Sequence, residues 1–231
     1  MQRSHSSVLD ALGAAERRRL WARSVTRSLR RGESLHLAGE RAGRVHLVRD
    51  GVLKLSARNA AGGEAILGLA VPGQLVGEVP ALDGGAHPLD AIAVVSSAVT
   101  GFPVDLFVEV VERSPSAAVE LARRAAARER WLVDAVVERS VAEVPARLAG
   151  RLLDLADLLG SVKEGAVELD LPLDQDDLGR LAGMCRESAC RTLRRFKARG
   201  VVDYRGRTLR ILRPDVLEKI RCAGRAGALS R

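Results

Sequence analysis

The chain has 231 residues, of which 47% are hydrophobic, 29% charged and 3% aromatic, and its formal net charge is +8. This length and apolar fraction exclude a wholly disordered chain and predict one or two domains with sizeable cores. The longest apolar stretches, 89–99 and 104–111, are too short or too interrupted to cross a bilayer, so no membrane partner is expected. The N-terminus lacks the apolar core of a secretory signal, and three cysteines suit free thiols, so we expect a cytoplasmic protein.

Residues 1–112 predict an all-β domain. Eleven of the 22 glycines fall between positions 32 and 85, and short strand-like runs lie between them, at 45–48, 52–56, 65–69, 75–76 and 92–95. Short strands separated by glycine turns are typical of an antiparallel sandwich or barrel.

Residues 113–143 predict one long helix and a hinge. Ser114 followed by Pro115 is a helix-start signal, and no glycine or proline follows until Pro145, which is expected to stop the helix. At 1.5 Å per residue the helix would be roughly 40 Å long, more than packing on its own domain requires. We interpret its apolar stripe as the seam of a homodimer, although an ordinary helix packed on its own sheet remains an alternative. The seam residues are Leu121, Ala125, Leu132 and Val136.

Residues 144–231 predict a DNA-binding domain. An amphipathic helix over 146–159 precedes a compact unit from Leu171 to Leu212. The positive charge is concentrated in this part, because residues 186–213 contain ten Lys or Arg and two acids, and the rest of the chain has no net charge. Such a local basic patch is typical of a protein that binds a polyanion.

The pattern within the compact unit describes a helix-turn-helix. Asp174 is expected to cap a short helix, and Gly183 allows a left-handed turn. A second helix begins near Arg186 and ends at Gly200, apolar on one face and basic on the other. The following segment, 201–212, reads as a hairpin with a basic glycine tip, so the motif would be winged.

The exposed face of the second helix predicts base reading. Arginine can bond to guanine O6 and N7, and glutamate can accept from cytosine N4. Glu187 is the informative residue, because a carboxylate close to phosphates is unfavourable unless it reads a base. The other interpretation is a charged surface helix with an incidental glutamate. The candidate DNA-binding residues are Arg186, Glu187, Ser188, Arg191 and Gln175, with Arg194, Arg195, Lys197, Arg205 and Arg207 as phosphate anchors.

These features resemble the CRP/FNR family of bacterial transcription regulators. The string Gly183-Met-Cys-Arg-Glu-Ser-Ala-Cys-Arg191 is similar to the family's recognition helix at its Gly, its Arg-Glu pair and the Arg four residues after the Glu. Residues 144–156 are similar to the helix before it, and residues 72–79 to the Gly-Glu turn of the sensor domain.

The resemblance implies an α+β fold. Its parts are an N-terminal β-roll or jelly roll like a cyclic-nucleotide-binding domain, a long dimerisation helix and a C-terminal winged helix-turn-helix. It also implies a homodimer on palindromic double-stranded DNA with TGTGA-like half-sites, where Arg186 and Arg191 read guanines and Glu187 a cytosine. RNA polymerase is a further partner to be tested.

The sensor departs from the family's cyclic-nucleotide binders. Those members carry an arginine that pairs with the phosphate, followed by Ser or Thr, where this chain has Pro88 and Leu89. Proline offers neither a side-chain donor nor a backbone N–H. Leu132 and Val133 align where those members place two hydroxyls against adenine, so we do not expect cyclic AMP to bind in the usual way. A hydrophobic ligand and a filled pocket without ligand both remain open. The candidate effector pocket comprises Gly77, Glu78, Pro88, Leu89, Leu132 and Val133.

The effector is otherwise undetermined. A cysteine-ligated iron–sulfur cluster in the sensor is not expected, since no cysteine precedes Cys185. Haem is an alternative for which His36, His46 and His87 are available as axial ligands. We found no metal-spaced cluster, nucleophile elbow or phosphate-binding glycine loop, so neither an enzyme nor a metal site is expected. A DNA binder that needs no effector and is controlled by its abundance remains the main competitor to a ligand-gated regulator.

Overall fold

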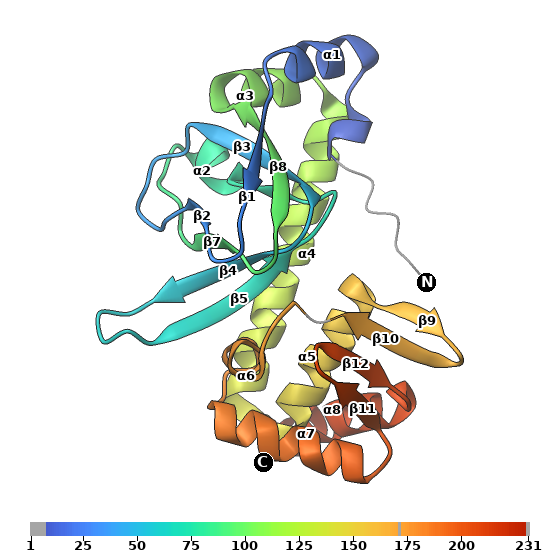
Figure 1. Cartoon of the computed structure of the whole chain (residues 1–231). Helices are drawn as coiled ribbons and strands as arrows, with labels where there is room; N and C mark the ends of the chain where they lie inside the picture. The colour runs from blue at the N-terminus through green and yellow to red at the C-terminus, as the bar shows by residue number, and fades with distance from the viewer. Residues whose placement is uncertain (1–7, 171, 230–231) are drawn as a thin grey trace. The chain divides into compact units, whose positions relative to one another are not determined.

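The computed structural model describes residues 8–170 and 172–229 (Figure 1). Leu171 and the outer ends of the expected first and last domains, residues 1–7 and 230–231, lie outside the described residues. The chain divides between Arg130 and Trp131 into two compact units, each considered by itself. None of the helices within the described ranges is long and apolar enough to span a bilayer.

The first unit contains two antiparallel sheets, which confirms the predicted β-structure. Their strand orders are β1-β8-β3-β6 and β2-β7-β4-β5. Leu29, Val48, Leu53 and Val99 are buried together in one of its core clusters. The strands are β1 (Val25–Leu29), β2 (Ser34–His36), β3 (Arg44–Asp50), β4 (Leu53–Arg58), β5 (Glu64–Ala70), β6 (Leu75–Val76), β7 (Asp90–Ala93) and β8 (Ser97–Pro103).

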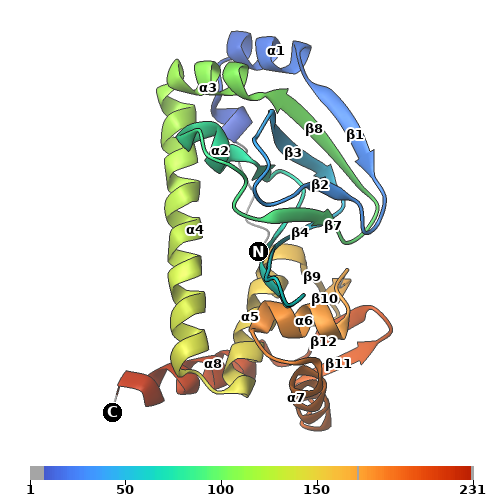
Figure 2. The ribbon, with the colours of Figure 1, turned by 90° about the vertical axis from the view of Figure 1, so that its left-hand side faces the viewer.

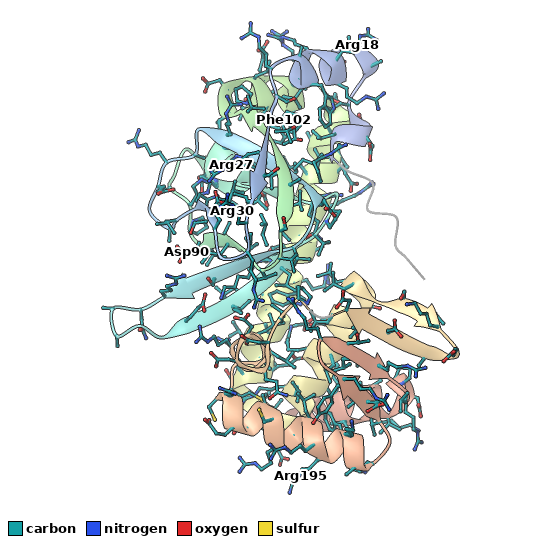
Figure 3. The ribbon with its side chains drawn as sticks, in the orientation of Figure 1. Arg18, Arg27, Arg30, Asp90, Phe102 and Arg195 are labelled. Atoms are coloured by element: carbon teal, nitrogen blue, oxygen red, sulfur yellow. The ribbon has the colours of Figure 1, made fainter. Side chains whose placement is uncertain are left out.

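Two helices, α1 (Ala14–Ala22) and α3 (Val104–Glu112), lie at one end of these sheets (Figure 1). A second core cluster joins them to the strands, with Trp21 edge-on to Phe102 at 5.2 Å between ring centroids; Phe102 is labelled in Figure 3. The Gly-Glu segment, expected as a turn, opens a short helix at Glu78. The helices are η1 (Val8–Ala11), α1 (Ala14–Ala22), α2 (Glu78–Asp83), α3 (Val104–Glu112) and α4 (Pro115–Val141).

Helix α4 is the predicted long helix, continuous over 27 residues (Figure 2). Pro145 does not stop it: α4 ends at Val141, and Pro145 lies in the first turn of α5 (Val144–Leu159), where a missing N–H costs no helical hydrogen bond. The expected seam also needs correction. Leu121 is only 6% exposed and packs in the core of the first unit, so it is not part of an exposed stripe.

The second unit combines helices with one four-stranded sheet of order β11-β12-β10-β9. The predicted helix-turn-helix and wing are present, and β10 pairs with the wing strand β12, which ties the wing to a hairpin that the sequence pattern did not indicate. After α5 the elements are β9 (Ser161–Lys163), β10 (Ala166–Asp170), α6 (Gln175–Ala182), α7 (Arg186–Ala198), β11 (Val202–Arg205), β12 (Thr208–Ile211) and α8 (Pro214–Leu229).

Candidate nucleic-acid interface and sensor site

The turn between α6 and α7 is fixed by its end residues. Oδ1 of Asp174 accepts hydrogen bonds from the backbone N–H groups of Asp176 and Asp177, at 2.9 and 2.8 Å, which caps α6 as predicted. Gly183 ends α6 at φ +67°, and a Cβ there would lie 2.5 Å from Nε of Arg139. A residue with a Cβ would be strained at this φ and would displace the exposed side chain of Arg139, so glycine is favoured here.

Helix α7 buries one face and exposes the other. Ala189, Leu193 and Phe196 are buried, as predicted. Thr192 is also buried, and its hydroxyl donates to the carbonyl oxygen of Ser188 at 2.8 Å. These contacts hold α7 in one rotational setting, which determines the side chains that point outward.

The outward face presents charged groups that form no ion pair with any residue the structure describes. Arg186, Glu187, Arg191, Arg194 and Arg195 are exposed, and Figure 3 shows Arg195 pointing away from α7. Within the described part of the chain, none of the four arginines forms an ion pair with a carboxylate. A shallow hollow on this face is lined by Arg186, Glu187, Cys190, Arg191 and Arg194.

Glu187 lies in the first turn of α7 and remains ionised. Its own backbone N–H, then the thiol of Cys185 and the charge of Arg186, lower the pKa of its carboxyl. An ionised carboxylate is only an acceptor. This side chain can therefore accept from an amino group such as cytosine N4, but it cannot donate to a phosphate.

Two expected contact residues are tied to neighbours. The thiol of Cys190 donates to Oε1 of Gln175 at 2.8 Å, which orients Gln175 against α7. Ser188 is half-buried, and its hydroxyl accepts from Nη2 of Arg191 at 3.3 Å. Cys190 lies three residues after Glu187, on the same face of α7.

The wing carries two exposed arginines at its tip, Arg205 and Arg207. Arg207 Nη2 donates to the carbonyl oxygen of Pro172 at 3.2 Å, so this side chain partly secures the wing. Lys197, expected as a phosphate anchor, is instead paired with Oδ1 of Asp203 at 2.7 Å and joins α7 to the wing.

In the sensor, Gly77 and Glu78 meet at the start of α2. Gly77 has φ +88°, and a Cβ there would lie 3.0 Å from Cε1 of His87. Glu78 is half-buried; burial raises the pKa of its carboxyl, while the charges of Arg128 and Arg124 act in the opposite direction. Arg128 was not predicted as a site residue. In the sequence it is only a charged residue that interrupts the apolar stripe of the predicted long helix.

The other four predicted pocket residues do not all belong to the same compact unit. Pro88 is exposed and Leu89 half-buried in the first unit, whereas Leu132 and Val133 belong to the second unit, where they are half-buried and exposed. The pocket therefore stays a prediction.

The three histidines considered for haem lie in the first unit. The rings of His36 and His87 are stacked at 3.5 Å between centroids. Burial lowers the pKa of His36 and of His46 to about 4, so both are neutral. Neutral histidines packed in a core are ordinary structural residues, and nothing in this geometry singles out one of them as an axial ligand.

Comparison with known proteins matches both units. Residues 26–114 match the cyclic nucleotide-binding domain, and residues 146–220 match the Crp-like helix-turn-helix domain. A "CRP-like cAMP-activated global transcriptional regulator" of Mycobacterium tuberculosis is 26% identical over 78% of this chain and 81% of its own.

Two solved structures are similar over most of their length. FixK2 from Bradyrhizobium japonicum aligns with a TM-score of 0.77 at 22% identity, over 85% of this chain and 96% of its own. A putative cyclic nucleotide binding protein from Ruegeria pomeroyi is 30% identical, with a TM-score of 0.62, over 90% of this chain and 92% of its own.

Proposed function

Because this chain belongs to the CRP/FNR family of transcription regulators, we propose that it binds, as a homodimer, a palindromic DNA site with TGTGA-like half-sites. The observation that carries the proposal is the outward face of α7, where four arginines and one ionised carboxylate are exposed and form no ion pair within the described ranges. Guanidinium groups held in this way keep donors for guanine edges and phosphates, and Arg191 commits one of its own to the hydroxyl of Ser188 at 3.3 Å.

The roles divide by position along α7. Arg186 and Glu187 lie in its first turn and Arg191 follows one turn later, so these three read bases in the major groove. Arg194 and Arg195 lie further along the helix, and with Arg205 and Arg207 of the wing they contact phosphates. Gln175, at the first position of α6, contacts the backbone beside them.

Exposed apolar residues on α4 support the homodimer. Val133, Val136, Val137 and Val141 are exposed, Val136 by 63%, and they recur at helical spacing. Such a stripe favours an interface with a second copy of the helix. Ala125 is exposed and Leu132 half-buried on the same helix, so the seam is centred nearer the C-terminal end of α4 than the sequence indicated.

The sensor does not use cyclic AMP in the usual way. Pro88 is exposed and supplies no donor for a phosphate, and the printed name of the M. tuberculosis relative describes that protein only. Activation by cyclic AMP or by haem is the alternative. The relatives are transcription regulators. This favours a cytoplasmic protein that is not an enzyme. RNA polymerase would be its partner when it is bound to DNA.

Fluorescence anisotropy tests the proposal. The protein is titrated onto a TGTGA-N6-TCACA duplex and onto a scrambled duplex, at physiological salt, with and without cyclic AMP. We expect a preference for the palindrome of roughly 1,000-fold or more, the lower end of the usual range for specific over non-specific binding, and no change on adding the nucleotide. Equal affinity for both duplexes would overturn DNA reading, and a preference that needs cyclic AMP would overturn our account of the sensor.

A further inference from the structure

The last turn of α4 lies against the turn between α6 and α7. Nη2 of Arg139 donates a hydrogen bond to the carbonyl oxygen of Arg180, in the last turn of α6, at 3.4 Å. A Cβ at Gly183 would lie 2.5 Å from Nε and 3.2 Å from both Cγ and Cζ of the same arginine. The side chain of Arg139 therefore packs into the space that Gly183 leaves open.

The turn that Arg139 contacts determines where α7 begins. The backbone N–H of Met184 donates to the carbonyl oxygen of Gly179 at 2.9 Å. A Cβ at Gly179 would be 3.0 Å from the carbonyl oxygen of Met184, so the turn is packed closely on α6. Helix α7 starts directly after this turn, at Arg186. A shift of the turn is therefore passed to the first turn of α7, which carries Arg186 and Glu187.

The backbone of α4 is held at the same place. The carbonyl oxygen of Arg139 accepts from Nη1 of Arg147, on α5, at 3.3 Å. The neighbouring Glu138 pairs with Arg151 of α5 and with Arg221 of α8. The end of α4 is thus fixed to α5 and α8, while the side chain of Arg139 reaches to α6.

Charge pairing does not account for the position of Arg139. Among the residues that the structure describes, no carboxylate forms an ion pair with it. Loss of water around the guanidinium, and then the positive charges of Arg151 and Arg147, lower its pKa. The position is therefore unfavourable for a cation, and the contacts that offset this cost are the packing on Gly183 and the hydrogen bond to Arg180.

We propose that Arg139 is a positioning residue for base reading. Its side chain sets the turn between α6 and α7, and through it the first turn of α7, so that Arg186 and Glu187 reach the base edges. Arg139 itself contacts no base. The inference rests on the proposed function for this consequence. Because α4 is continuous from Pro115 to Val141, the same contact couples the orientation of its last turns to the two recognition side chains.

Two substitutions of Arg139 separate packing from charge. Arg139→Ala empties the space beside Gly183, and we expect a roughly tenfold loss of affinity for TGTGA-N6-TCACA with nearly unchanged affinity for the scrambled duplex. Arg139→Met keeps a side chain whose last carbon can take the place of Nε, so it should retain most of the preference although the charge is lost. Arg130→Ala, which removes an exposed arginine from the same helix, is the matched control. Fluorescence anisotropy measures all of these affinities.

A double-mutant cycle tests whether Arg139 acts through Gly183. Gly183→Ala adds the Cβ that meets Arg139, and it should also weaken binding to the palindrome. In the double variant the colliding side chain is absent, so its loss of affinity should be clearly smaller than the sum of the two single losses. A general loss of stability would not produce this coupling.

Hydrogen–deuterium exchange gives a readout that does not involve DNA. We expect faster exchange over residues 184–190 in Arg139→Ala than in the wild type, and exchange close to that of the wild type in Arg139→Met. If Arg139→Ala does not fold, Gly183→Ala replaces it, with faster exchange expected over the same residues.

Three results would overturn the proposal. One is an equal loss of affinity on both duplexes in Arg139→Ala with a salt slope lower by about 1, which would make Arg139 a phosphate anchor. The others are additive losses in the cycle and unchanged exchange in Arg139→Ala. A wild-type protein that does not prefer the palindrome would count against the proposed function alone, because the exchange experiment still decides the contact between Arg139 and Gly183.

Discussion

At the scale of single residues, Glu187 separates base reading from general attraction to DNA. Its carboxylate is ionised and exposed, so it contributes nothing to phosphate binding. We expect Glu187→Ala to weaken binding to the TGTGA palindrome by about 1–3 kcal/mol and to tolerate changes at the cytosine position, because the specific acceptor is lost. Anisotropy on duplexes altered at that base pair measures the effect. An equal change on every duplex would contradict it.

Arg194 is expected to behave in the opposite way. As a phosphate anchor it should contribute equally on all sequences, so Arg194→Gln weakens specific and scrambled duplexes alike and reduces the salt slope of binding by about 1. The slope is obtained from titrations at several salt concentrations. Arg41→Gln, an exposed arginine of the first unit, serves as the control and should leave the slope as it is.

The sequence predicted which residues of α7 are exposed or buried better than it predicted the contacts of Arg128, for a physical reason. Helical periodicity relates neighbours within one helix, so charged and apolar positions of α7 separate on the sequence alone. Arg128 depends on Leu67 and Gly68, which lie on a strand far away in sequence. A contact between residues so far apart in sequence cannot be predicted from helical periodicity.

At the scale of elements, a buried charge network joins α4, α5 and α8. Glu138 and Arg151 are 2% and 4% exposed and are paired with each other. Arg151 also contacts Asp154 at 2.6 Å, and Arg221 of α8 reaches Glu138 at 3.4 Å. Trp131 donates to Asp154 at 3.1 Å. These groups hold three helices together where α4 ends.

Removing one member of this network should destabilise the second unit. Arg151→Met leaves Glu138 buried without its main partner, and we expect a loss of about 3–5 kcal/mol in the free energy of unfolding. Urea denaturation measures it. Lys219→Met breaks a surface pair with Asp215 at 3.9 Å and should cost under about 1 kcal/mol. Similar losses in both variants would contradict a structural role for the network.

Elements without a strong amphipathic pattern could not be predicted from the sequence. Strand β1 lies at a sheet edge and exposes four of its five residues, so it shows no alternation. Strand β9 is exposed throughout. Both are defined by pairing with distant strands, which a local pattern does not reveal.

At the scale of the whole molecule, buried His36 and half-buried His46 predict acid sensitivity. Folding lowers the pKa of His36 and His46 to about 4, against about 6.5 in an unfolded chain, so the unfolded state binds more protons between these values. Their contribution to stability is complete above about pH 6.5 and is lost as the pH falls toward 4. Urea denaturation from pH 7.5 to 4.5 measures the decline.

A variant separates this effect from the titration of carboxylates. His46→Gln removes one of these two imidazoles. As the pH is lowered, the free energy of unfolding of this variant should therefore decrease less steeply than that of the wild type. Parallel pH profiles would show that the histidines do not cause the decline.

We expect one homodimer to read two half-sites about one helical turn apart. The most direct measurement compares the affinity for TGTGA-N6-TCACA with that for the same duplex carrying five extra base pairs between the half-sites. Five base pairs place the second half-site on the opposite side of the helix, beyond reach of the second α7. We predict that the affinity for the duplex with the longer spacer is at least tenfold lower and approaches the affinity for scrambled DNA. Equal affinity at both spacings would contradict the claim, because each copy would then bind its half-site independently.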